Sequence, residues 1–236
     1  MARRGGPNVN VAIYGQAFVH LVRHPSILLL PLAAAAIDLF IWYWSTLFTD
    51  PLGGFGAGLF QMVVQIVYLF AFGGAVIQAN NIARGYRTTF GDAWDETRRK
   101  SGGILLAAIG FQFVTWIAQY IGQFLGIGVL SIALQLIAYF FLILTIPAAA
   151  IGGLPGGLAI SGSIRAVRAN WPACVVLAIV FIALWIYLPV YALLPLAPYG
   201  AITYKVGGAV LSAIVLAYLA FPFAVTYDET AFRGYY

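Results

Sequence analysis

Six long apolar runs divide this chain, and they constrain its fold more than any other feature. The runs cover residues 27–48, 55–80, 103–125, 128–150, 173–194 and 205–226. The first run would form a helix about 33 Å long, which is enough to cross the hydrocarbon core of a bilayer. Proline and glycine within the runs do not exclude helices, because helices in lipid tolerate both. The sequence therefore predicts an all-α integral membrane protein with six transmembrane helices.

The composition excludes a soluble fold. Apolar residues make up 63% of the 236 residues and charged residues only 8%, and the mean hydropathy is +0.95. Soluble domains carry about 25% charged residues, and no compact soluble fold would hide this much apolar surface. We therefore expect lipid to be the solvent for much of the chain, and we interpret residues 1–236 as a single polytopic membrane domain.

Basic residues fall almost wholly on one side of the predicted spans. The twelve Lys and Arg residues lie in the N-terminal segment, the 81–102 and 151–172 loops and the C-terminal tail, except Lys205, which lies at the edge of a loop on the other side. Loops rich in Lys and Arg stay in the cytoplasm under the positive-inside rule. The sequence thus predicts a multi-pass protein of a bacterial or archaeal cytoplasmic (inner) membrane, with both termini cytoplasmic.

Three stretches that precede the odd-numbered spans share one pattern. Residues 14–30 align with 90–106, and residues 160–172 align with both. The apolar positions in each follow the i, i+3, i+4, i+7 spacing of a helix with one apolar face. These positions are Tyr14, Ala17, Phe18 and Leu21; Phe90, Ala93, Trp94 and Thr97; and Ile160, Ser163, Ile164 and Val167. We expect three amphipathic helices on the cytoplasmic side, with charged residues on their opposite faces.

The even-numbered spans repeat as well. They match over FGGAV, IPAAA and FPFAV, at residues 72–76, 146–150 and 221–225. Pro147 and Pro222 take equivalent places, and Gly73 stands there in the first copy. Because proline removes a backbone hydrogen bond, we expect a helix kink at both prolines. The sequence predicts three parallel repeats of a cytoplasmic amphipathic helix and a helical hairpin, approximately 11–84, 87–155 and 157–229.

This pattern resembles that of a loose group of six-span bacterial and archaeal membrane proteins. The resemblance is carried by a basic amphipathic helix before each hairpin and by proline in the even-numbered spans, over most of residues 11–229. The group includes the membrane domain that accompanies some glycerophosphodiester phosphodiesterases, and several families of unknown function. The resemblance implies the six-span architecture. It supplies no catalytic residues, and the 236 residues hold no phosphodiesterase catalytic domain.

Asp38 is the sharpest local anomaly, because it lies near the middle of the first span. A charged carboxylate at this depth costs several kcal/mol and is a functional candidate by default. No Lys or Arg lies at comparable depth in another predicted span. The sequence therefore predicts a carboxyl group that is neutral, or hydrogen-bonded to Gln or Tyr side chains. Its role is then a structural hydrogen bond, or else proton coupling or polar-ligand binding.

Glutamines are the other polar candidates inside the spans. They are Gln61, Gln65, Gln112, Gln119 and Gln123. The first two lie one helical turn apart, and the last three form a strip along the third span. Such side chains join helices through hydrogen bonds of about 0.6 kcal/mol each, or they line a polar pathway. The strip lacks a charged partner, which favours contacts between helices.

Seven basic residues form a predicted cytoplasmic collar. They are Arg84, Arg87, Arg98, Arg99, Lys100, Arg165 and Arg168. Each basic residue near an anionic leaflet contributes about 1 kcal/mol of attraction, so we expect contact with anionic lipid headgroups first and with an acidic partner protein second. Nucleic acid is not expected, because Asp92, Asp95 and Glu96 interrupt the stretch.

The residues that metal or nucleophilic chemistry needs do not gather in any motif. His20 and His24 could share a helix face, but metal sites need three or four ligands and the chain has only these two histidines. Cys174 is the single cysteine, which excludes an intrachain disulfide. No nucleophile and base are paired at a recognisable spacing. We therefore predict no enzyme, no cofactor and no metal site.

Two classes of function remain. The first is a non-enzymatic integral membrane scaffold or accessory subunit of a larger membrane assembly, indicated by the short loops. The alternative is a small-molecule or lipid transporter, or a lipid-handling protein, that uses a polar interior around Asp38 and the glutamine strip. Membrane lipids and other membrane subunits are the expected partners.

Overall fold

The computed structural model describes residues 9–233, and every regular element within them is a helix. The side chains of 46–57, 186, 190, 196–197 and 232–233 lie outside that description. The elements are α1 (Ala12–Arg23), η1 (Pro25–Leu28), α2 (Leu29–Ala83), α3 (Phe90–Arg99), α4 (Ser101–Phe124), α5 (Gly128–Leu142), α6 (Thr145–Ala150), α7 (Gly157–Ala169), α8 (Trp171–Phe181), η2 (Ile182–Tyr187), α9 (Leu188–Leu193), η3 (Leu194–Tyr199) and α10 (Ala201–Arg233). The predicted all-α class is confirmed.

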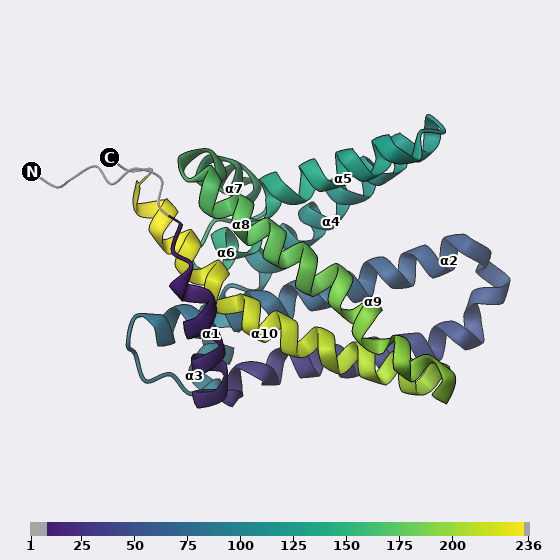
Figure 1. Ribbon diagram of the computed structural model, residues 1–236, viewed down its shortest axis with the longest axis horizontal. Coiled ribbons are helices and arrows are strands. Elements are labelled where there is room, and N and C mark those ends of the chain that lie inside the picture. The colour runs from purple at the N-terminus through teal and green to yellow at the C-terminus, as the bar shows by residue number, and fades with distance from the viewer. Residues whose placement is uncertain (1–8, 234–236) are drawn as a thin grey trace, which may run out of the picture.

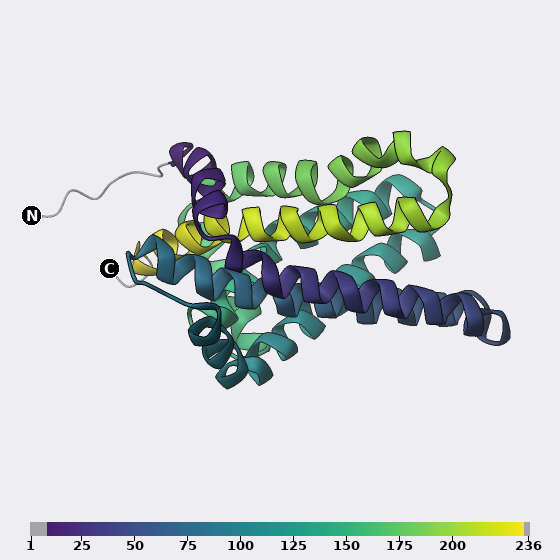
Figure 2. The same cartoon turned by 90° about the horizontal axis from the view of Figure 1, so that it is seen from below.

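Three short helices, α1, α3 and α7, lie at one end of the molecule, and α10 also ends there (Figures 1 and 2). We call this the short-helix end. A helix that runs away from this end follows each short helix: α1 leads through η1 into α2, α3 leads into α4, and α7 leads into α8. The last pair meets at a bend of 113°.

Five stretches of helix are long and apolar enough to cross a membrane. They are Pro25–Ser45, Gly58–Ala83, Ser101–Phe124, Gly128–Ala150 and Ala201–Ala231. The first two are the arms of α2, which folds back on itself (Figure 2). The number reaches six when the bent pair of Gly157–Ala169 and Trp171–Trp185 is counted as one span. By length and composition, these are the helices of a multi-pass membrane protein.

The predicted span at 173–194 does not form one regular α-helix. Helix α8 ends at Phe181, and the π-helical stretch η2 then leads into α9, which has Pro189 in its first turn. Proline lacks a backbone donor and crowds the carbonyl four residues earlier, and a π-helical turn accommodates the missing bond. The sequence pattern indicates that helices in lipid tolerate proline, but it does not predict this change of helix type.

The core is built where the three matching segments of the even-numbered spans meet. Residues 72–76, 146–150 and 221–224 are all buried, and α2 packs against both α6 and α10. Small residues allow the close approach: a Cβ added at Gly73 would stand 2.7 Å from the side chain of Ile104. The rings of Phe72 and Phe223 meet edge to face at 5.0 Å. Helices in lipid gain most of their association from such tight packing.

The two prolines expected to kink their helices lie in different settings. The chain breaks between α5 and α6, just before Pro147, and Ser163 of α7 occupies the break. Its hydroxyl accepts a hydrogen bond from the Leu144 backbone N–H at 3.0 Å and donates to the Phe141 carbonyl at 2.8 Å. One side chain thus satisfies a donor and an acceptor at the break. Pro222 instead lies inside α10, which continues through it.

Candidate functional site

Asp38 forms an ion pair deep in the bundle. Its carboxylate, on the first arm of α2, accepts hydrogen bonds from the Lys205 ammonium of α10 at 2.8 and 3.0 Å and from the Tyr68 hydroxyl of the second arm at 3.1 Å. The Asp38 side chain is 8% exposed and that of Lys205 is 30% exposed. The three groups connect both arms of α2 to the beginning of α10. We call them the Asp38 cluster.

The prediction that Asp38 has no cation at its depth is therefore wrong. The sequence pattern placed Lys205 at the edge of a loop, but α10 begins at Ala201, one helical turn earlier. A lysine stem can extend several ångströms along the helix, so its ammonium reaches a group deeper than its own Cα. Charged residues inside membrane-spanning segments usually pair with one another. This rule could have predicted both that Lys205 lies within a span and that it pairs with Asp38. The predicted hydrogen bond from a Gln or Tyr side chain is present, with Tyr68 as its donor, although the sequence did not indicate which tyrosine would donate it.

The Asp38 cluster joins helices, but burying its charges costs desolvation free energy, which is offset only when both charged groups are paired. An ion pair out of water loses hydration, and removing one partner leaves an uncompensated charge. Here the carboxylate has three hydrogen bonds from two side chains, so its negative charge is well satisfied. The ring of Trp185 packs edge-on against Tyr68 at 5.7 Å and holds the tyrosine in place. The arrangement stabilises the contact between α2 and α10.

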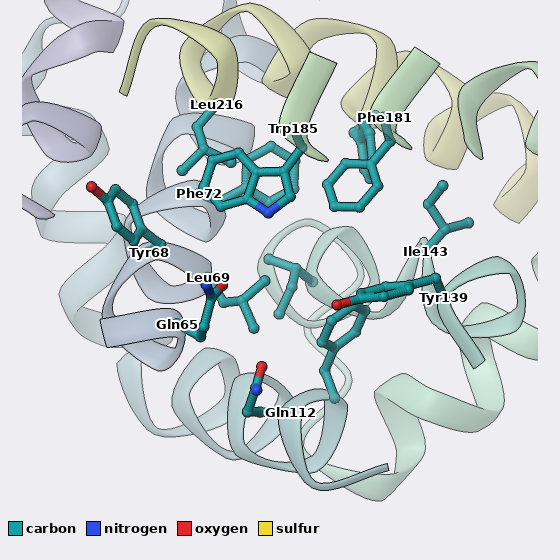
Figure 3. A pocket seen from close by; sticks show the side chains of 13 residues that line it. Gln65, Tyr68, Leu69, Phe72, Gln112, Tyr139, Ile143, Phe181, Trp185 and Leu216 are labelled. Carbon is teal, nitrogen blue, oxygen red and sulfur yellow. The ribbon is translucent and has the colours of Figure 1, made fainter. Parts of the chain in front are cut away.

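A small cavity lies beside the Asp38 cluster, between α2, α4, α10 and the segments around α5 and η2 (Figure 3). Its volume is about 30 Å³, which is room for one or two water molecules. Most of its wall is aromatic or aliphatic, while the Gln112 amide, the Tyr139 hydroxyl and the Trp185 indole N–H point into it (Figure 3). Tyr68 belongs to the same wall, but its hydroxyl points away from the cavity. The ring of Tyr68 is thus shared by the cavity and the ion pair.

The glutamine candidates have different surroundings. Gln65 and Gln112 both line the cavity, whereas Gln61 and Gln123 are exposed and Gln119 is half-buried. The reason is that the outer part of α4 diverges from α2 (Figure 1). A different glutamine joins two elements at the short-helix end: Gln78 of α2 donates to the Ser26 hydroxyl of η1 at 2.8 Å.

The seven collar residues divide into two groups. Arg84 pairs with Asp228 of α10, and Lys100 donates to Glu96 at 2.8 Å and to the Ala150 carbonyl at 2.7 Å. Lys100 thereby links α3 to the C-terminus of α6, where the helix dipole favours a cation. The other five form no ion pair among the side chains that the structure describes: Arg87, Arg98, Arg99, Arg165 and Arg168. All five are exposed at the short-helix end.

The acidic residues of α3 have local structural roles. Thr89 and Asp92 form a capping box, in which the Asp92 carboxylate accepts from the Thr89 backbone N–H at 2.9 Å. This hydrogen bond lowers the pKa of Asp92. Burial works to raise the pKa of Glu96, but the hydrogen bond and charge of Lys100 outweigh it, and the pKa is lowered. Glu96 also accepts from Asn81 of α2 at 3.4 Å, so it does not simply face water.

His20 and His24 pack on each other and on the core. Their rings stack at 6.3 Å, and His20 also stacks on Phe221 at 5.1 Å. The Nδ1 atom of His20 is buried and has no hydrogen-bond partner among the described residues. Burial, reinforced by the charges of His24 and Arg23, lowers the pKa of His20. Among the residues described, no three His, Cys, Asp or Glu side chains are grouped so that they could hold a metal ion.

The hairpin of α4 and α5 stands apart from the rest of the bundle. Its two helices pack tightly on each other: Gly122 lies against the Ser131 backbone, and the Ser131 hydroxyl donates to the Gln119 carbonyl at 2.7 Å. Beyond its inner end the hairpin projects away from α2 and α10 (Figure 1). Only 28% of the most apolar stretch of α4 is buried, against 61% in α10. Large side chains are correspondingly exposed, with Phe124 at 91% and Val129 at 79%.

These features define a helical multi-pass membrane protein with an ion pair inside the bundle and a projecting hairpin. The chain matches no protein-family model, no curated protein and no solved structure.

Proposed function

We propose that the protein is a non-enzymatic membrane scaffold or accessory subunit that binds a transmembrane helix of another subunit along its α4–α5 hairpin. The observation that carries the proposal is the projection of this hairpin from the bundle (Figure 1). A hairpin that packs well on itself yet leaves its flanks exposed is a rigid element available for assembly.

Polar side chains on the hairpin favour a protein neighbour over lipid. Gln119 of α4 and Gln135 of α5 are half-buried, and their amides make no hydrogen bond within the described part of the chain. Hydrocarbon offers no partner for an amide, whereas a neighbouring helix does. A second helix along the hairpin would satisfy these amides and cover the exposed aliphatic side chains together.

The experiment is co-purification from the native membrane after gentle extraction, analysed by native mass spectrometry. We expect a defined complex, and we expect the double variant Gln119→Leu, Gln135→Leu to lose the partner. The control is Gln61→Leu, which makes the same chemical change on an exposed position of α2 and should keep the complex. Detection of the isolated protein alone, under conditions that preserve other membrane complexes, would refute the assembly role.

We also propose that the short-helix end faces the cytoplasm of a bacterial or archaeal cell. Among the residues described, all Lys and Arg except Lys205 lie in the helices or connecting segments at that end, and Arg3 and Arg4 lie outside the described residues. The positive-inside rule places such an end in the cytoplasm. A cysteine in place of Tyr199, which is 75% exposed, should react with an impermeant maleimide in intact cells. A cysteine in place of Arg87 should react only after permeabilisation; the reverse pattern would invert the topology.

The proposal of three parallel units has structural support at equivalent positions. Ala17 of α1, Ala93 of α3 and Ser163 of α7 occupy the same place in the repeated pattern, and all three are fully buried. The positions one residue later are more open, with Phe18 62% and Trp94 41% exposed. Each short helix thus buries the same small-residue edge against the bundle.

A transport role is the second candidate, and the Asp38 cluster is the observation that favours it. Tyr68 connects the ion pair to the cavity, whose lining includes the amide of Gln112 and the hydroxyl of Tyr139. Ligand sites usually enclose about 300–1,000 Å³, so the cavity of about 30 Å³ would have to open during transport. Flux into proteoliposomes that is lost in Asp38→Asn and retained in Gln61→Leu would support this role. Equal flux with and without the protein would count against it.

A further inference from the structure

A cavity at the short-helix end is lined by a basic side chain. It lies between α7 and α10 and has a volume of about 120 Å³. Its wall includes Leu154, Gly162, Arg165, Ala169, Tyr227 and Thr230. No acidic residue is among the described residues that line it. This is a different space from the cavity beside the Asp38 cluster.

Small residues create the space. Gly162, Ala166 and Ala169 follow one another along one side of α7, at the spacing that places side chains on a common helix face. Ala231 of α10 stands opposite. A Cβ at Gly162 would come within 2.7 Å of the end of the Leu154 side chain, which would have to move to make room. The cavity therefore results from the small residues on the facing sides of α7 and α10.

No acidic side chain that the structure describes neutralises the charge of Arg165. Arg165 is exposed and forms no ion pair among the described side chains. The acidic residues near the end of α10 are already engaged: Asp228 pairs with Arg84, and Glu229 accepts from Asn10 at 3.5 Å. A guanidinium group carries five N–H donors in a planar fork that matches the oxygens of a phosphate. Arg165 thus offers an unused anion-binding group at the edge of a cavity.

The depth of the cavity matches the headgroup layer of a bilayer. Thr230 lies about 44 Å along the axis of α10 from Ala201, at 1.5 Å per residue. A tilt of about 20° reduces the span across the membrane to roughly 41 Å. The hydrocarbon core is about 30 Å thick and the bilayer with headgroups about 40–45 Å. If α10 begins at one membrane surface, Thr230 lies at the headgroup level of the other.

We propose that the cavity between α7 and α10 binds the phosphate group of an anionic membrane lipid, with the Arg165 guanidinium donating to the phosphate oxygens. The adjoining surface of Leu154 and Ala169 would contact the glycerol and the first methylenes of the lipid. Free phosphate offers the same oxygens, and the depth of the cavity favours the lipid as the source. The site is independent of the assembly role of the hairpin, because it lies on other helices.

Lipid retention tests the site. The purified protein is exchanged into nanodiscs with equal amounts of phosphatidylglycerol and phosphatidylcholine, released, and analysed by native mass spectrometry. We expect the wild type to retain phosphatidylglycerol preferentially and Arg165→Gln to lower this retention about fivefold, as the loss of one basic contact implies. Arg168→Gln is the matched control, since Arg168 is an exposed arginine on the same helix that does not line the cavity, and it should change retention less than twofold.

Two further variants separate the cavity from charge alone and from misfolding. Ala169→Leu keeps the arginine but fills the space from an exposed position, and it should also lower retention. Arg165→Lys keeps the charge but not the planar fork, and it should fall between Arg165→Gln and the wild type. The melting temperature of each variant shows whether it is folded.

Equal losses for Arg165→Gln and Arg168→Gln, full retention in Ala169→Leu, or equal retention of both lipids by the wild type would each overturn the site. Release of phosphatidylglycerol by millimolar inorganic phosphate would show that the cavity recognises the phosphate group itself, from either source. Continued retention under that challenge would show that the lipid is its ligand.

Discussion

The α4–α5 hairpin and the core of α2, α6 and α10 have similar composition but very different surroundings. The most apolar 18-residue window within Gly128–Ala150 has a mean hydropathy of 2.5 and that within Ala201–Ala231 one of 2.2, yet 33% of the first window is buried against 61% of the second. Hydropathy therefore identifies helices that enter lipid without telling which of them pack together. Small residues distinguish the packed region, where 72–76, 146–150 and 221–224 come into contact.

Charge marks the packed region as well. The Asp38 cluster joins both arms of α2 to α10, while the projecting hairpin carries amides and aromatic rings but no ionic side chain between Ser101 and Leu142. A pair of charges in lipid tolerates little change of distance, whereas amides can exchange partners. The ion pair thus favours a single arrangement of α2 and α10, whereas the flanks of the hairpin can still contact another helix.

The largest loss of stability should follow from breaking the ion pair in the core. The Asp38 side chain is only 8% exposed, so Lys205→Met leaves a buried carboxylate without its cation. This should cost about 3 kcal/mol of unfolding free energy. The double variant Asp38→Leu, Lys205→Met should recover a substantial part. Denaturant unfolding in mixed micelles gives both values, and additive effects of the two single changes would show that the pair does not couple.

Overpacking the core should have the next largest effect. A Cβ at Gly74 would collide with Leu30 and come within 3.0 Å of the Thr97 hydroxyl, so Gly74→Leu should destabilise the protein by about 2 kcal/mol. Gly102→Leu, at the beginning of α4, is the matched change, because nothing lies within 4 Å of a Cβ there. Thermal unfolding should separate the two variants clearly, and equal shifts would contradict the packing difference.

On the projecting hairpin, truncation should hardly affect the isolated chain. Phe124 is 91% and Val129 79% exposed, so Phe124→Ala and Val129→Ala should each change the unfolding free energy by no more than about 0.5 kcal/mol. The measurement is again thermal unfolding of the purified protein. A loss as large as that of Gly74→Leu would mean that the hairpin packs against the core.

The smallest effect should be a pH dependence of the contact between α1 and α10. The folded-state pKa of His20 is lowered by burial against Phe221, so the unfolded state binds the proton more readily. Stability should be constant above about pH 7 and should fall as the pH drops below the ordinary histidine value near 6.5. Hydrogen exchange of α1 between pH 7.5 and 5.5 measures it, and His20→Phe should remove the dependence on this group.

The sequence predicts where the helices of this protein lie in the chain better than it predicts which helices pack against each other. Apolar runs long enough for a bilayer identify five of the spanning stretches, and the i, i+3, i+4, i+7 spacing identifies α1, α3 and α7, because both signals are local. The contact of Lys205 with Asp38 connects residues 167 positions apart, and no local pattern encodes it. The projection of the hairpin was also unpredicted, since leucine and isoleucine fit equally well against lipid and against another helix.

Within the candidate site, too, the sequence identifies single residues but not their contacts. Asp38 stood out because a lone carboxylate is conspicuous in an apolar run, whereas Tyr68 is one of 14 tyrosines and carries no signal of its own. Gln65 and Gln112 reach one cavity only because α2 and α4 lie side by side at that level. Gln119 and Gln123 continue the same pattern onto a part of α4 that has diverged. Tertiary geometry, not residue type, decides which polar groups meet.

The separation of Asp38 and Lys205 in the chain has a consequence for biosynthesis. A ribosome that adds about 5–20 residues per second needs roughly 8–33 s to proceed from one to the other. During that interval the first arm of α2 is already made while the cation that completes it does not yet exist. The nascent protein must therefore accommodate the Asp38 carboxyl group without its lysine partner until α10 is made, and a chain that stops before α10 never completes the pair.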